Sequence, residues 1–120
     1  MADMLRPGCY SMAGSDPVVI ALNGEWDIYR RDELRELFRA AYDAENAILN
    51  LSAVSYADST ILSELVHMRK HRAAQGLAPV ALVPSRQFER VLSITRMSHL
   101  WPCYANVAEA LEYYSSLRLA

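Results

Sequence analysis

Residues 47–60 read Ala-Ile-Leu-Asn-Leu-Ser-Ala-Val-Ser-Tyr-Ala-Asp-Ser-Thr, which places an apolar run, a polar segment and a helix start in direct succession. The apolar run 47–51 is typical of a strand that is buried on both faces. Asp58 and Ser59 carry side-chain oxygens of the kind that cap helix N-termini, so a helix is expected to start near Ser59. A strand that leads into a helix in this way indicates an α/β domain.

The same alternation continues on both sides of this stretch. The β-branched run 18–22 ends at Asn23-Gly24, and its continuous apolarity predicts a central strand. Between Arg30 and Ala44, apolar residues recur with the helical period, which predicts an amphipathic helix. In chain order, the expected strands are 9–12, 18–22, 47–51, 80–83 and 102–104, and the expected helices run from Arg30 to Ala44, from Ser59 to Gln75, from Ser85, and through Val107 and Tyr114.

Short connections between strands and helices make at least part of such a sheet parallel. Functional groups of α/β domains gather where the strands end and the helices begin. The segments 23–27, 52–60 and 84–87 are therefore the candidate functional loops, and 55–60 is the richest of them in polar side chains.

Composition narrows the class of protein. A chain of 120 residues with 52% hydrophobic and 22% charged residues is expected to fold around one core. The formal net charge of -2 argues against nucleic-acid binding, which requires an excess of basic residues. No run of eighteen apolar residues is present, so we expect a cytoplasmic protein without membrane insertion. Cys9 and Cys103 are widely separated, and they are interpreted as free thiols rather than as a disulfide.

The sequence lacks the usual signatures of an enzyme or of a metal site. It has no GxSxG motif and only four glycines, too few for a glycine-rich phosphate loop, so neither catalysis nor a cofactor is expected. His67 and His71 are four residues apart, but the surrounding sequence is not HExxH, and a solvated helix face that includes Glu64 is favoured over zinc. The basic cluster Arg69, Lys70 and Arg72 is interpreted as part of the same polar surface.

Several residues have two interpretations. Trp26 and Trp101 either anchor a partner or close the edges of the core. Asp27 either caps the following helix or faces a partner. The hydroxyls of Ser59 and Thr60 lie at a helix start, where backbone N–H groups and the helix dipole would stabilise an added phosphate. The alternative is that Asp58 or Ser59 only caps the helix, and both interpretations can hold together.

The stretch from Asn50-Leu51-Ser52 to Tyr56-Ala57-Asp58-Ser59-Thr60 resembles the signature of STAS domains, the family of sulphate-transporter and anti-sigma-factor-antagonist domains. Gly24-Glu25-Trp26-Asp27, Pro84 to Leu92 and Ala108 to Leu111 are similar to further family segments. The similarity covers about residues 9–117, so we expect an N-terminal extension at 1–8 and a STAS domain at 9–117. The resemblance implies an α/β fold with a central mixed sheet of four to five strands, flanked by about four helices.

The resemblance also implies a bacterial anti-sigma-factor antagonist. Such a protein binds an anti-sigma factor that is also a serine kinase, is switched off by phosphorylation at the position of Ser59, and is reset by a serine phosphatase. The implied partner-binding residues are Asp27, Asp58, Ser59, Thr60 and Ile61, with no catalytic or metal-binding residue and no cofactor. The alternative is a STAS subunit of a larger assembly, such as a lipid-transport complex or a stress-signalling scaffold, without phosphorylation. Whether the domain forms a homodimer is left open.

One position departs from the family pattern. Ile61 stands where the family motif has glycine. A β-branched side chain at that point is expected to restrict the close approach of a partner or of a nucleotide phosphate to the helix start.

Overall fold

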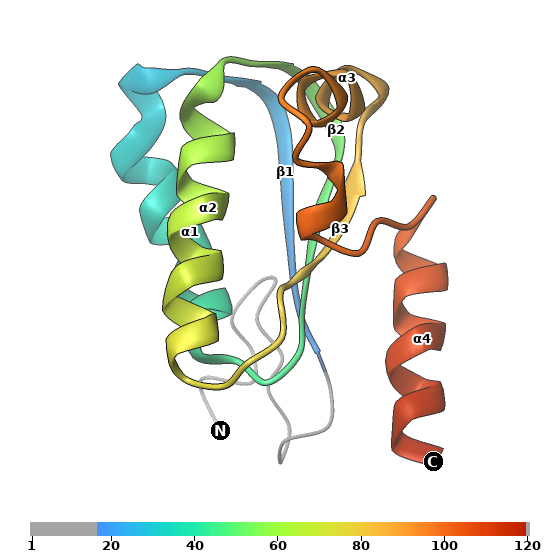
Figure 1. Cartoon of the computed structure of the whole chain (residues 1–120). Helices are drawn as coiled ribbons and strands as arrows, with labels where there is room; N and C mark the ends of the chain where they lie inside the picture. The colour runs from blue at the N-terminus through green and yellow to red at the C-terminus, as the bar shows by residue number, and fades with distance from the viewer. Residues whose placement is uncertain (1–16, 120) are drawn as a thin grey trace, which may run out of the picture.

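Three parallel strands form the sheet in the computed structural model, which describes residues 17–119 of the chain (Figure 1). Within these residues the spatial order is β1-β2-β3. The elements, in chain order, are β1 (Val18–Trp26), the short 3-10 helix η2 (Ile28–Arg30), α1 (Arg31–Asp43), β2 (Ala47–Ala57), α2 (Ser59–Ala74), β3 (Ala81–Pro84), α3 (Arg86–Ile94), the short 3-10 helix η3 (Ser98–Leu100) and α4 (Val107–Leu119).

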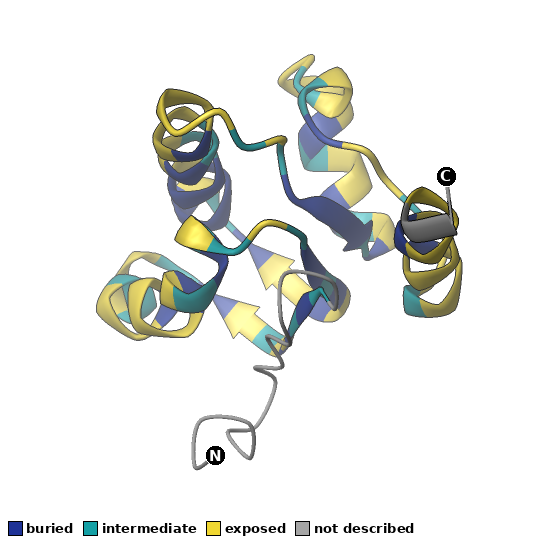
Figure 2. Cartoon of the chain, turned by 90° about the horizontal axis from the view of Figure 1, so that it is seen from below, coloured by how far each residue is buried: buried dark blue, intermediate teal, exposed yellow. Residues whose placement is uncertain are grey.

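The helices lie on both sides of the sheet. Helices α1 and α2 lie side by side against one face, α4 lies beyond the other face, and α3 lies near the carboxyl ends of the strands (Figure 1). The larger core contains residues of the sheet, α1, α2 and α3, and the smaller one lies between the sheet and α4. Buried residues therefore line the interior, whereas the outer helix faces are exposed (Figure 2). Trp26 and Trp101 belong to the larger core, so the interpretation that they close its edges is confirmed.

The predicted α/β fold is confirmed, with differences in the sheet. All described strands are parallel, and the segment expected as a strand at 102–104 contributes only an isolated bridge between Cys103 and Leu82. The strand expected at 9–12 lies outside the described residues. The expectation that 18–22 forms the central strand is wrong for the described part of the sheet, in which β2 occupies the centre and Ala21 of β1 is exposed.

Strand β2 is longer than predicted because it continues through the polar segment 52–57. Its pairing with β1 skips one residue of β2 between Asn50 and Ala53 and another between Val54 and Tyr56. Each extra residue is a bulge that resets the in-and-out alternation, so polar residues continue the strand without following a period of two. The two strands nevertheless end level, because Trp26 pairs with Ala57.

Arg72 of α2 is 1% exposed, so the prediction that it belongs to a polar surface is wrong. Its guanidinium donates hydrogen bonds to four main-chain carbonyls. The acceptors are the oxygens of Ala41 (2.7 Å), Ala44 (2.6 Å), Glu45 (3.1 Å) and Ala78 (2.7 Å). Helix α1 has no basic residue in its own last turn, so Arg72 supplies the positive charge and the donors that the end of this helix lacks.

Two helices end in the same hydrogen-bonding motif with different residues at its critical position. After α2, Gly76 and Leu77 donate to the carbonyls of Ala73 and Arg72, and Gly76 has a φ of 77°. After α3, Arg96 and Met97 donate to the carbonyls of Ser93 and Leu92, and Arg96 has a φ of 60°. This pattern is the Schellman motif, in which glycine normally takes the left-handed residue. Arg96 therefore adopts a backbone conformation that is strained for a residue with a side chain.

Replacing Arg72 should test whether its buried hydrogen bonds stabilise the fold. We expect Arg72→Met to lower the free energy of unfolding by about 3 kcal/mol or more, because four carbonyls lose a charged donor. Lys70→Met is the matched control on the exposed side of the same helix, with an expected change within about 0.5 kcal/mol. Urea unfolding followed by circular dichroism measures both, and equal losses in the two variants would contradict the assigned role.

The strain at Arg96 can be measured in the same way. Arg96→Gly should raise the free energy of unfolding by about 0.5–1 kcal/mol, since relief of the left-handed strain exceeds the added entropy of the unfolded chain. The reverse change, Gly76→Arg, should lower stability by about 1 kcal/mol for conformational reasons alone, because a Cβ there would meet no atom within 4 Å. An unchanged or lower stability of Arg96→Gly would show that the turn is not strained.

Candidate functional site

The carboxyl ends of β1 and β2 meet the start of α2 and form the candidate site. Ser59 is the first residue of α2, and its side chain is exposed. The neighbouring segment is the turn from Asp27 to Arg30, which connects β1 to α1. Strand pairing between Trp26 and Ala57 holds these two segments next to each other.

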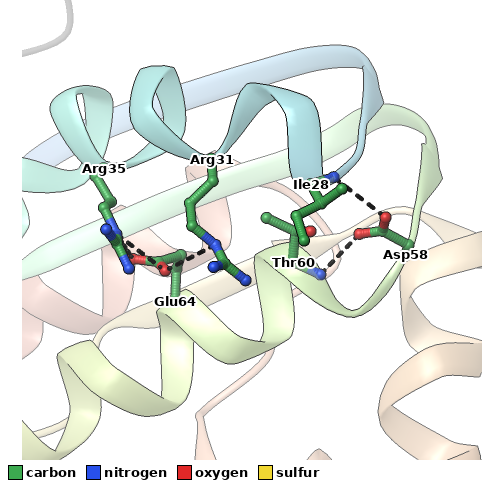
Figure 3. A network of polar contacts seen from close by, with 6 residues as sticks. All are labelled: Ile28, Arg31, Arg35, Asp58, Thr60 and Glu64. Atoms are coloured by element: carbon green, nitrogen blue, oxygen red, sulfur yellow. Dashed lines mark hydrogen bonds and ion pairs between the residues drawn. The ribbon is translucent and has the colours of Figure 1, made fainter.

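Asp58 joins the two segments (Figure 3). Its Oδ1 accepts the main-chain N–H of Thr60 at 2.8 Å, which makes it the N-cap of α2, and its Oδ2 accepts the main-chain N–H of Ile28 at 3.3 Å. The main-chain N–H of Asp58 in turn donates to the carbonyl of Trp26 at 3.3 Å. A single aspartate thus caps the helix and fixes the turn after β1 to the turn after β2, as the sequence predicted for its capping role.

The carboxylate of Asp58 is stabilised in its charged form. Hydrogen bonding by the side chain and the main chain of Thr60, followed by the N–H of Ile28 and the charge of Arg31, lowers its pKa below the usual value. At neutral pH the residue before Ser59 is therefore an anion whose two oxygens are both occupied by backbone donors.

Exposed apolar side chains occur in the segments that meet at this junction. Ile28 is 55% exposed, Tyr29 is 92% exposed, and Tyr56 is 47% exposed. Sequence analysis did not select them, and the only available signal was their apolar character within otherwise polar loops and strand ends. Large apolar side chains that project from a short segment beside a polar group are typical of protein contact surfaces.

Arg30 braces the turn that carries Ile28 and Tyr29. Its guanidinium carbon lies 3.7 Å from the centre of the Trp26 ring, and its Nη1 donates to the carbonyl of Glu25 at 2.7 Å. The same guanidinium forms an ion pair with Glu33 at 3.0 Å. These contacts hold the backbone of the turn in place while its apolar side chains remain outside.

The structure separates the predicted site residues into two groups. Asp27, Asp58 and Ser59 lie together at the end of the sheet, and Asp27 caps η2 by accepting the N–H of Tyr29 at 3.0 Å. Thr60 and Ile61 are buried, so their side chains lie inside the domain, and their assignment as partner-binding residues stays a prediction. The expectation that Ile61 obstructs the helix start is wrong, because this side chain belongs to the core.

Glu64 lies one turn further along α2, and it is buried rather than part of a solvated face as predicted (Figure 3). Arg35 donates to both of its carboxylate oxygens, at 3.1 and 3.2 Å, and Nε of Arg31 lies 3.8 Å from Oε2. The ion pairs connect α1 to the first two turns of α2. They hold α2, the helix that begins with Ser59, against α1.

The two histidines that the sequence analysis considered as zinc ligands lie on the outer side of α2. His67 and His71 are exposed, and Nε2 of His71 lies 3.1 Å from Oδ1 of Asp43. Residues 17–119 contain no group of three His, Cys, Asp or Glu side chains that could hold a metal ion. In the same residues, no helix combines the length and the apolar character needed to cross a membrane.

Comparisons with known proteins agree with the resemblance found in the sequence. Residues 11–110 match the family model of the STAS domain. A Thermotoga maritima protein assigned as an anti-sigma factor antagonist has 26% sequence identity and a TM-score of 0.69, over 88% of this chain and 91% of that chain. The anti-sigma factor antagonist SpoIIAA, in its unphosphorylated form, shares the fold with 22% identity and a TM-score of 0.63, over 86% and 93% of the two chains. The predicted family and fold are confirmed.

The role of Asp58 can be tested by two substitutions. Asp58→Ala should lower the free energy of unfolding by about 1 kcal/mol, because the N-cap of α2 is lost. Asp58→Asn keeps a capping oxygen, but it removes the negative charge of the carboxyl group, whose pKa is lowered in the folded protein. That charge contributes stability above the unfolded pKa of about 3.9, and the contribution is lost as the pH falls through the lower folded pKa. When the pH is lowered from 7, the free energy of unfolding of Asp58→Asn should therefore fall less than that of the wild type.

Unfolding free energies measured from pH 7 downwards decide this point. Glu112→Gln, which removes an exposed carboxylate from α4 on the other side of the sheet, is the control and should retain the wild-type acid dependence. If Asp58→Asn also retains it, the Asp58 carboxylate does not stabilise the fold through its charge.

Proposed function

Because the chain belongs to the STAS domain family, we propose that it is an anti-sigma-factor antagonist. In this proposal, the end of the sheet that carries Ser59 docks an anti-sigma factor, and phosphorylation of Ser59 by that partner ends the interaction. A serine phosphatase removes the phosphate and restores binding. The protein acts as a binding protein and not as a catalyst.

The observation that supports this function best is the position of the Ser59 side chain. It is exposed at the first residue of α2, directly after the capping aspartate. The segments that meet at this helix start also carry the exposed side chains of Ile28, Tyr29 and Tyr56. A kinase can reach a hydroxyl in this position without unfolding the domain. The apolar side chains provide contact area for a protein partner that covers the same hydroxyl.

A phosphate on Ser59 would weaken the docking of a partner through its negative charge. Phosphorylation adds a charge of about -1.5 to -2 and three acceptor oxygens. The added charge would lie next to the Asp58 carboxylate, whose lowered pKa keeps it ionised at neutral pH. A partner surface fitted to a neutral hydroxyl and to apolar neighbours would have to desolvate this charge without pairing it, which weakens binding.

The same phosphate should leave the domain folded. Negative charge in the first turn of a helix interacts favourably with the helix dipole, typically by about 0.3–1 kcal/mol. The capping hydrogen bond is made by Asp58, so Ser59 can be modified without loss of the cap. Phosphorylation is therefore expected to change affinity and not stability.

We expect incubation with the cognate anti-sigma factor and ATP to add one phosphate, measured by intact mass, and Ser59→Ala to add none. In the absence of ATP, when the anti-sigma factor cannot transfer phosphate, Ser59→Asp should bind it at least about tenfold more weakly than the wild type does. The thermal unfolding of this variant should be unchanged. Ser115→Asp, an exposed serine of α4, is the control and should bind normally.

Two results would contradict the proposal. Wild-type affinity of Ser59→Asp would show that charge at this position does not control docking. The absence of phosphate on the wild-type protein, together with stable incorporation into a larger complex, would favour the alternative role as an unphosphorylated subunit of an assembly.

A further inference from the structure

Three arginines on and after α3 differ from the arginines of the helices on the sheet face. Arg30, Arg31, Arg35 and Arg39 have carboxylate partners, and Arg69 and Arg72 donate to main-chain carbonyls. Arg86, Arg90 and Arg96 are exposed, and none of them has a hydrogen-bond or ion-pair partner within residues 17–119. Glu89 stands between Arg86 and Arg90 in α3, but within residues 17–119 it forms no ion pair with either of them. The three arginines and this carboxylate therefore leave an excess of positive charge on α3 and the turn after it.

Arg86, Arg90 and Ile94 lie along one side of α3, and Arg96 follows in the turn after it. Arg86 and Arg90 are one turn apart, and Ile94, a further turn along, is 80% exposed. Arg96 follows in the strained left-handed conformation that glycine would adopt more easily. The result is a cationic ridge with an apolar side chain at its end, formed by Arg86, Arg90, Ile94 and Arg96.

A cavity of about 490 Å³ adjoins α3. Its lining comes from the end of β3, from α3 and from the segment 98–105, and it consists of Pro84, Glu89, Leu92, Ser93, Ser98, Cys103, Tyr104 and Ala105. Most of the lining is uncharged, and Glu89 is its one charged residue. Glu89 and Ser93, which line the cavity, each follow an arginine of the ridge by three residues, so the cavity adjoins Arg86 and Arg90. The volume is within the range of sites that hold a small ligand or a buried side chain.

We propose that the ridge and this cavity form a second docking surface, which binds an acidic peptide segment that carries a large apolar side chain. The apolar side chain occupies the cavity, and carboxylates on either side of it pair with Arg86 and Arg90. Arginine forms bidentate hydrogen bonds with carboxylates, and an apolar pocket bordered by charged residues is the usual arrangement of a binding hot spot.

The alternatives fit the same surface less well. A lipid bilayer would require a broader apolar face than the single exposed Ile94 of this ridge. A nucleic acid would require more basic residues, and the net charge of the chain is -2. Because the ridge and the cavity do not include Ser59, this inference does not depend on the function proposed above.

The test uses the full chain with Cys9→Ser, so that Cys103 is its only thiol, and a peptide of sequence Asp-Glu-Leu-Phe-Glu-Asp with blocked ends. Titration followed by amide NMR shifts should show saturable changes centred on residues 84–105. At saturation, the peptide should slow the alkylation of Cys103 by N-ethylmaleimide at least about threefold, because this thiol lines the cavity.

Matched variants separate a specific site from general attraction. The double variant Arg86→Ala, Arg90→Ala should weaken the peptide at least about fivefold. Arg39→Ala, Lys70→Ala removes the same charge from α1 and α2 and should leave the affinity within about twofold. A peptide with Ala-Ala in place of Leu-Phe should bind at least about fivefold more weakly, since it has no side chain for the cavity.

Four results would overturn the proposal: no saturable binding, equal weakening in the two double variants, unchanged affinity of the Ala-Ala peptide, or no protection of Cys103. Tighter binding to vesicles containing anionic phospholipid, or to duplex DNA, with the same dependence on Arg86 and Arg90 would assign the surface to a different class of partner.

Discussion

The buried guanidinium of Arg72 determines where α2 lies. Its hydrogen bonds reach the end of α1, the connection from α1 to β2, and the connection from α2 to β3. One side chain thus joins segment 41–45 to α2 and to the connection that follows it. A buried charge without a carboxylate is stable only where dipoles surround it, and the carbonyls at the end of α1 provide this environment. The helix that begins with Ser59 is fixed at its far end by this interaction.

The opposite end of α2 is fixed by carboxylates. Asp58 binds the N–H groups of Thr60 and Ile28, and buried Glu64 pairs with Arg35 from α1. Both ends of α2 are therefore tied to the elements that precede it, and the exposed first turn projects from a rigid support. Charges inside the molecule are matched by nearby groups of opposite sign or by backbone dipoles. The unmatched charges of Arg86, Arg90 and Arg96 lie on the surface, where a partner can supply the missing groups.

Sequence reasoning identified the elements that local chemistry controls. The apolar period of α1, the cap at Asp58, the start of α3 at Ser85 and the end of α2 near Gln75 were predicted, because each depends on residues within a few positions. The extension of β2 through 52–57 was missed, because two bulges interrupt the alternation by which a strand is recognised. Pairing between strands decides such irregularities, and it is not visible in one strand alone.

The placement of polar side chains in α2 was missed for a related reason. Glu64 and Arg72 look like surface residues of an amphipathic helix, and both are buried because their partners come from α1 and the loops. The sequence predicted where the helix of the candidate site begins, but it did not predict which side chains around that point are exposed. Asp58 and Ser59 follow from the helix start, whereas the exposure of Tyr29 and the burial of Ile61 depend on how the turn after β1 packs against α2.

Capping and modification fall on different residues at the start of α2, and this separation has a consequence for the proposed switch. Had the capping oxygen belonged to Ser59, a phosphate on it would have replaced the hydrogen bond that starts the helix. Asp58 makes that bond, and Ile61 anchors the first turn in the core. Ser59 contributes neither to the cap nor to the core, so its chemistry can change while the backbone around it stays the same. A surface that changes charge without changing shape alters only what can dock on it, which is the property that reversible exchange of partners requires.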